Sequence, residues 1–135
     1  MEVFFYGLFM DMDILKKNGI NPTNPRKGCL NNYTLKIGTR ASLIQSENEK
    51  AYGIIMTIND EEIVKLYSEK SVADYIPEKV EIVTEVNEYL TVTCYNLPSE
   101  LLKGTNELYA KSLYKLAKKL NFPLEYLRKI QKDYT

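Results

Sequence analysis

The 135-residue sequence contains no histidine, and this absence restricts the chemistry open to it more than any other feature. Histidine is the usual general base of serine and cysteine hydrolases and the commonest metal ligand. The two cysteines, Cys29 and Cys94, lie far apart in the sequence and do not form an ordinary zinc ligand set. We therefore expect no structural metal, and any catalysis must use carboxylates, tyrosines, lysines, thiols or backbone amides.

The first candidate site is the turn Tyr6-Gly7-Leu8-Phe9-Met10, where a hydrophobic run ends in glycine shortly before a predicted helix. Such a junction can point several backbone N–H groups at one place and so hold a carboxylate, a phosphate or a developing oxyanion. The turn lacks the repeated glycines of a dinucleotide-binding loop or a P-loop. A single glycine after a strand also fits a plain turn, so both interpretations stay open.

The second candidate is Glu69, which lies six residues before Tyr75. A carboxylate in a partly apolar cleft has its pKa raised toward neutrality, which is what a general base for an amine requires. The alternative is an ordinary solvated glutamate.

The composition bounds the kind of protein that positions these residues. With 44% hydrophobic and 27% charged residues, the chain has the balance of one globular domain, here residues 1–135. Its size is sufficient for a core without disulfides, and two cysteines are too few for a disulfide framework, so we expect both to be reduced thiols in the core. No apolar run approaches the roughly 18 residues of a membrane span, and no basic leader precedes one, so we expect no membrane partner and a cytoplasmic location.

The first half of the sequence alternates between short apolar runs and turn-forming residues. Alternating apolar residues at Tyr33, Leu35 and Ile37 indicate a half-buried strand. Asn59 is placed to cap a helix that runs to about Tyr67. The other elements expected here are strands at 3–6, 41–44 and 51–58, a helix at 11–17, a turn at 21–25 and a charged loop at 46–50.

The second half begins with two strand-like runs, 80–83 and 90–94, which suggest a hairpin around Asn87. From Thr105 the spacing becomes helical, and Asn121 and Pro123 end this helix before a last one at 124–131. The residues that helical spacing places on the inner face are Tyr109, Leu113, Leu116 and Leu120. Strands with a few helices, rather than strict alternation, favour an α+β fold with a small mixed sheet or barrel and flanking helices.

Several short motifs in this order resemble the γ-glutamylcyclotransferase-like (AIG2-like) family. They are Tyr6-Gly7 after the first strand, Gly-Thr-Arg-Ala-Ser-Leu-Ile at 38–44, Ala-Tyr-Gly-Ile-Ile-Met at 51–56, and Glu69 followed by Tyr75. The resemblance implies the family fold and the conversion of a γ-glutamyl amine to 5-oxoproline and a free amine, without cofactor or metal. It also implies that Glu69 is the acid–base, that the backbone amides from Gly7 to Met10 hold the substrate, and that Tyr6 and Tyr75 line the pocket.

Two positions depart from the family pattern. Leu8 stands where members usually have serine or threonine, and Lys70 stands where glycine commonly follows the acid. Lys70 could pair with Glu69 and lower its pKa. An alternative is therefore a non-catalytic module that keeps the fold and binds a small anionic metabolite or a protein.

The C-terminal part of the sequence is basic, because residues 101–135 hold eight Lys or Arg against three acids. We expect a solvated helix face and no nucleic-acid partner, since the tyrosines fall at core spacing rather than among the basic residues.

Overall fold

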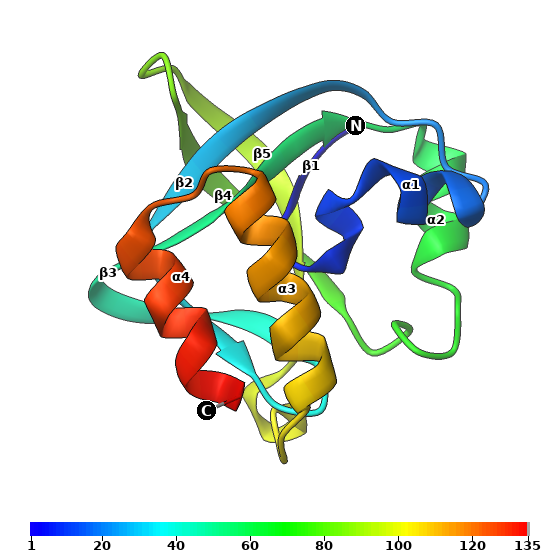
Figure 1. Ribbon diagram of the computed structural model, residues 1–135. Helices are drawn as coiled ribbons and strands as arrows, with labels where there is room; N and C mark the ends of the chain where they lie inside the picture. The colour runs from blue at the N-terminus through cyan, green and yellow to red at the C-terminus, as the bar shows by residue number, and fades with distance from the viewer. Residues whose placement is uncertain (135) are drawn as a thin grey trace.

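The computed structural model describes residues 1–134, and its centre is a closed barrel of five strands in the order β1-β3-β2-β4-β5 (Figure 1). All neighbouring strands pair antiparallel except β1 and β5, which close the barrel through a parallel pair between Val3 and Thr93. The predicted α+β fold with a small mixed barrel is confirmed. The strands are β1 (Glu2–Phe5), β2 (Thr23–Ile37), β3 (Ala41–Thr57), β4 (Ile76–Thr84) and β5 (Tyr89–Asn96).

The prediction of a turn at residues 21–25 is wrong, because β2 begins inside that segment. Thr23 already pairs with Thr57, and after a register shift Arg26 pairs with Ile55. Between them Asn24 has a φ of 54°. This irregularity accommodates a proline in the strand, since Pro25 has no N–H to give to the ladder.

The charged segment 46–50 is not a loop between two strands but an outward bulge within β3. Asn31 of β2 pairs with Lys50 of β3, and Tyr33 pairs with Gln45. Residues 46–49 of β3 are therefore inserted between two paired positions. Asn48 has a φ of 64°, and its N–H donates to the side chain of Asn32 at 3.2 Å. The turn-forming residues therefore bend one long strand rather than divide it.

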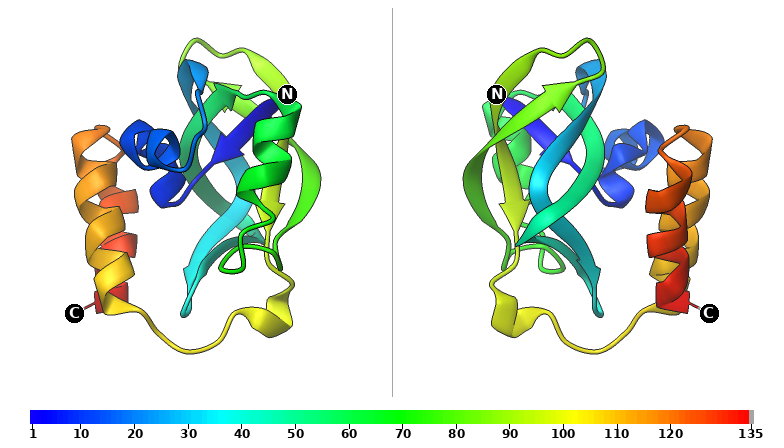
Figure 2. Two further views of the ribbon diagram at one scale, coloured as in Figure 1. Left: turned by 90° about the vertical axis from the view of Figure 1, so that its right-hand side faces the viewer. Right: turned by 90° about the vertical axis from the view of Figure 1, so that its left-hand side faces the viewer.

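The helices follow the predicted positions closely. Asp11, Asn59 and Asn106 cap the first turns of α1, α2 and α3 by accepting backbone N–H groups. The helices are α1 (Met12–Lys17), α2 (Asp60–Leu66), α3 (Glu107–Lys119) and α4 (Leu124–Gln131), with short 3₁₀ turns η1 (Leu8–Met10), η2 (Ser99–Leu101) and η3 (Lys132–Tyr134). Figure 2 shows α3 and α4 side by side against one wall of the barrel.

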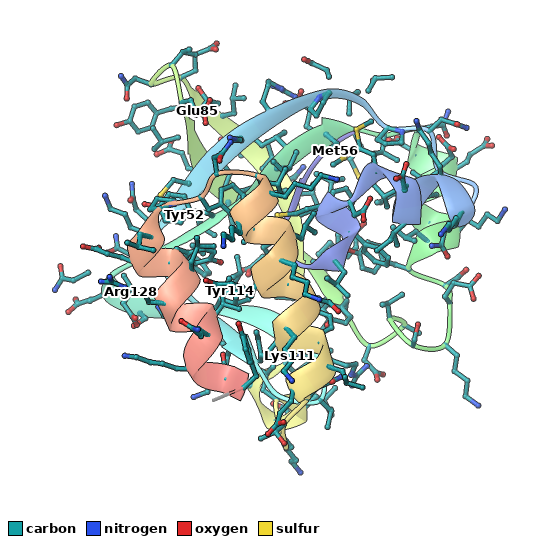
Figure 3. The ribbon with its side chains drawn as sticks, in the orientation of Figure 1. Tyr52, Met56, Glu85, Lys111, Tyr114 and Arg128 are labelled. Atoms are coloured by element: carbon teal, nitrogen blue, oxygen red, sulfur yellow. The ribbon has the colours of Figure 1, made fainter. Side chains whose placement is uncertain are left out.

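The two C-terminal helices are attached to the barrel through an aromatic cluster. Tyr52 of β3 lies where α4 meets the sheet (Figure 3), with its ring centroid 5.9 Å from that of Phe122 and 5.0 Å from that of Tyr126. On α3, Leu113 is fully buried and Tyr109 is half-buried. The predicted inward face is confirmed, and the exposed side chains of the helix include Lys111, Lys115, Lys118 and Lys119.

Both cysteines are free thiols, although only Cys94 is fully buried and Cys29 is half-buried. Within residues 1–134, no helix has the length and apolar character needed to cross a bilayer. The same residues contain no group of three or more His, Cys, Asp or Glu side chains arranged to hold a metal ion.

Candidate functional site

A cavity of about 310 Å³ lies where the end of β1, the β2–β3 turn, the segment after α2 and the start of α3 meet. Pockets that hold small molecules typically have volumes from about 300 Å³ upward and mainly apolar walls. The aromatic residues of this wall are Phe4, Phe5, Tyr6, Phe9, Tyr67, Tyr75, Tyr95 and Tyr109. The other lining residues are Gly7, Leu8, Ile14, Thr39, Arg40, Ala41, Ser71 and Val72.

Two of the tyrosines are fixed in place by hydrogen bonds to backbone carbonyls. The Tyr6 hydroxyl donates to the Tyr95 carbonyl at 2.7 Å, and the Tyr75 hydroxyl donates to the Ala41 carbonyl at 2.5 Å. Burial raises the pKa of both phenols, well above the ordinary value for Tyr6. Both groups are therefore neutral near pH 7, and each can still accept a hydrogen bond from a ligand.

Part of the cavity wall is a cluster of aromatic rings in contact with one another. The rings of Tyr67 and Tyr95 stack with centroids 3.9 Å apart and an interplanar angle of 10°. Phe9 meets the Tyr67 ring edge-on at 6.2 Å and the Phe5 ring at 6.0 Å. Such rings favour planar or apolar groups, which gain contact area and edge or stacking interactions.

The turn after β1 is in direct contact with Tyr109 of α3. The Leu8 N–H donates to the Tyr109 hydroxyl at 3.3 Å, and a Cβ on Gly7 would lie 2.4 Å from the same oxygen. Glycine is required here for close approach rather than for backbone conformation, because its φ is −109°. Burial raises the pKa of Tyr109 to about 12, although the Leu8 N–H acts in the opposite direction.

Among the described residues that line the cavity, Arg40 is the one with a charged side chain, and it comes from the turn between β2 and β3. Its Nη1 donates to the Asp74 carboxylate at 3.2 Å and to the Ser71 carbonyl at 3.4 Å. The guanidinium carbon lies 6.0 Å from the centroid of the Tyr75 ring. The cavity therefore has a cationic end next to its aromatic walls.

The structure brings together most of the residues singled out in the sequence. Tyr6, Gly7, Leu8, Phe9 and Tyr75 all line the cavity, whereas Met10 is buried on another side of η1 and borders a separate groove.

Glu69 is exposed and does not line the cavity. It lies in the turn after α2, between Tyr67 and Ser71, which both do. In the two successive turns of this segment the Glu69 N–H donates to the Leu66 carbonyl and the Val72 N–H donates to the Glu69 carbonyl, and residues 68–70 are exposed. Within the described residues Lys70 does not pair with Glu69.

Most of the other lining residues were not singled out in the sequence, and Tyr67, Tyr95, Tyr109 and Arg40 are the ones whose side chains define the site. Tyr109 was assigned to the helix core, because helical spacing does not distinguish a core from a cavity wall. Tyr67 and Tyr95 belong to separate elements that come into contact only in the tertiary structure, so the sequence does not show that they meet. Arg40 carried the one usable signal, a lone charge in a turn flanked by apolar strand residues.

Comparison with known proteins gives a match in structure alone. No protein-family model matches the sequence, and no curated protein matches it. A solved structure of a γ-glutamyl cyclotransferase superposes with a TM-score of 0.78 at 18% identity, covering 97% of this chain and 86% of the other. The chain has a γ-glutamylcyclotransferase-like fold.

Other structures with this γ-glutamylcyclotransferase-like fold have similar scores. An uncharacterized human protein, loc79017, superposes with a TM-score of 0.76 at 19% identity, covering 96% of this chain and 85% of that one. YkqA from Bacillus subtilis gives a TM-score of 0.78 at 17% identity, covering 99% of this chain but 54% of YkqA. These superpositions establish the fold, and the low identities leave the activity to be argued from the cavity.

Proposed function

We propose that the cavity beside the Tyr6-Gly7 turn binds a small molecule with a planar or apolar part and a polar end. The observation that carries this proposal is the make-up of the lining, in which the stacked rings of Tyr67 and Tyr95 occur together with Arg40 and its polar partners. A ligand of this kind gains apolar burial from the rings and orientation from the few polar groups.

The reaction that we propose for this site is γ-glutamyl cyclotransfer. The α-amine of a γ-glutamyl amine attacks the γ-carbonyl carbon, a new C–N bond closes the five-membered ring, and the original amide C–N bond breaks. The attacking amine loses a proton to Glu69, and the departing amine takes it up. Ring closure joins two groups of one molecule, so holding the substrate in a folded conformation supplies much of the rate enhancement.

The γ-glutamylcyclotransferase-like fold and the position of Glu69 between two lining residues support this assignment. It requires the exposed side chain of Glu69 to rotate into the cavity when substrate binds. The Leu8 amide already has a partner, and so we propose the Tyr109 hydroxyl as the hydrogen-bond donor to the γ-carbonyl oxygen. Because that hydroxyl accepts from Leu8, its own proton is free to be donated.

The test uses mass spectrometry to measure the release of 5-oxoproline from each member of a panel of γ-glutamyl amines. The Glu69→Gln variant keeps the shape of the side chain but removes its basic oxygen, so turnover should fall by about 10² to 10⁴, roughly 3 to 5 kcal/mol of barrier. Glu47→Gln is the matched control, because Glu47 is also an exposed glutamate but lies on the β3 bulge. Unchanged turnover in Glu69→Gln, with an unchanged thermal midpoint, contradicts the role of Glu69.

The second candidate function is a non-catalytic binding module. It is favoured by one observation, that within residues 1–134 no lining residue of the cavity carries a carboxylate. Saturable binding of γ-glutamyl amines without any 5-oxoproline release would select this function over the enzyme.

A further inference from the structure

We propose that Arg40 binds a carboxylate of the ligand, so that the site selects small aromatic or planar carboxylates over their neutral counterparts. This inference rests on the proposed small-molecule site but not on the proposed catalysis.

The backbone that carries Arg40 is held in place by the segment before α3. The Thr39 N–H donates to the Lys103 carbonyl at 2.8 Å, and the Asn106 side-chain amide donates to the Thr39 carbonyl at 3.1 Å. The turn itself is closed by the Gly38 N–H donating to the Arg40 carbonyl at 3.0 Å. A side chain on a tied turn loses less freedom on binding a ligand than one on a loose loop.

The two hydrogen bonds of the guanidinium leave one of its edges available. Both bonds, to Ser71 and Asp74, are made by Nη1. Nε and Nη2 bond to no other group among the residues that the structure describes. The two parallel N–H groups of that edge match the two oxygens of a carboxylate, which is the geometry that makes arginine the preferred anchor for this group.

The ion pair with Asp74 does not prevent Arg40 from binding a ligand carboxylate. Its side chain is 56% exposed, and that of Arg40 is 30% exposed. Ion pairs this close to solvent contribute about 0 to 1 kcal/mol, so a ligand carboxylate can share the guanidinium or replace Asp74. The Tyr75 ring beside the guanidinium keeps it at the cavity, and the described part of the lining contains no acid to repel an anionic ligand.

The experiment uses two probes of equal shape, 3-phenylpropanoate and 3-phenylpropanamide, titrated into the labelled protein and followed by NMR. Shifts of the Leu8 and Tyr75 amides show that binding occurs in this cavity. We expect the carboxylate to bind at least about 10-fold more tightly than the amide, a difference of about 1.4 kcal/mol. In Arg40→Gln this preference should fall to about 2-fold or less, whereas Asp74→Asn should keep or increase it because it removes the competing carboxylate.

Lys103→Gln is the matched control, since Lys103 is an exposed cation on the segment that holds the turn and its side chain is outside the lining. It should leave the preference unchanged. A preference that persists in Arg40→Gln, or one that is lost in Asp74→Asn, overturns the proposal. So does a wild-type protein that fails to bind the carboxylate at about 10 mM, a concentration corresponding to very weak affinity. If the preference depends on Arg40 but no γ-glutamyl amine is turned over, the catalytic proposal fails and this one stands.

Discussion

Gly7→Ala tests the contact between α3 and the turn that borders the cavity. The backbone conformation of Gly7, with φ −109° and ψ −152°, is open to alanine, so the substitution introduces no backbone strain. The added Cβ would lie 2.4 Å from the Tyr109 hydroxyl oxygen and 3.7 Å from the ring carbon that bears it. The conflict therefore involves a single oxygen atom.

The cost follows from the displacement of that oxygen. Moving it to an ordinary contact distance of about 3.4 Å requires a shift of about 1 Å, which breaks its 3.3 Å hydrogen bond with Leu8. Overpacking of this kind costs about 1 to 3 kcal/mol and the lost hydrogen bond about 1 kcal/mol, so we expect a loss of about 2 to 4 kcal/mol. With an unfolding entropy of about 2.1 cal/mol/K per residue over 135 residues, the thermal midpoint should fall by about 7 to 14 °C.

A double-mutant cycle with Tyr109→Phe isolates the cause. In the phenylalanine background the clashing oxygen is absent, so Gly7→Ala should cost less than about 0.5 kcal/mol, giving a coupling energy of about 2 kcal/mol. Urea denaturation of the four proteins, with calorimetry as a second probe, measures each term. If Gly7→Ala is neutral in the wild type, or equally costly in both backgrounds, the contact does not have the role described.

Three further outcomes are expected. Gly53→Ala should lower the free energy of unfolding by about 3 kcal/mol or more, or prevent folding, as measured by circular dichroism. The added Cβ would lie 2.3 Å from the carbonyl oxygen of Phe5, and this backbone atom cannot move away. Asn106→Ala should lower the free energy of unfolding in urea by about 1 kcal/mol through loss of the cap of α3. Stability should change little between about pH 6 and 8, since the sequence has no histidine. It should fall above about pH 10, because burial raises the pKa of Tyr6 and Tyr75 in the folded state and the unfolded state therefore loses these protons first. Urea titrations at several pH values measure this loss, and a flat profile up to pH 11 would contradict it.

The parts of the fold that could be predicted from the sequence are those set by local patterns. Alternation at Tyr33, Leu35 and Ile37 and the cap at Asn59 depend on neighbouring residues alone, and both agree with the structure. The long β2–β3 ribbon could not be predicted, because asparagine is typical of turns and its presence suggests that a strand ends. Here the asparagines in left-handed conformations lie at bulges within two long paired strands instead.

The candidate site also has residues that the sequence indicates and residues whose position depends on tertiary packing. The Tyr6-Gly7 turn and Tyr75 were indicated by the ordered motifs that resemble the γ-glutamylcyclotransferase-like family, and they line the cavity, while their roles there stay predictions. The outward direction of Glu69 could not be predicted, since it depends on how the segment after α2 packs on the barrel. The contribution of Arg40 depends on Tyr75 and Asp74, which lie more than thirty positions away in the sequence.

The parallel pair between β1 and β5 has a consequence for how the chain folds during synthesis. The β2–β3 and β4–β5 hairpins each join strands that follow one another directly or through a short turn, so each can form as soon as its own residues are available. The first strand pairs with residues 54–57 of β3 and with Thr93 of β5, so it completes the barrel only when those residues have been made. Contacts so distant in sequence close slowly. Until then Val3, Phe4 and Phe5 remain uncovered on the nascent chain, which leaves this strand open to incorrect pairing and to capture by chaperones.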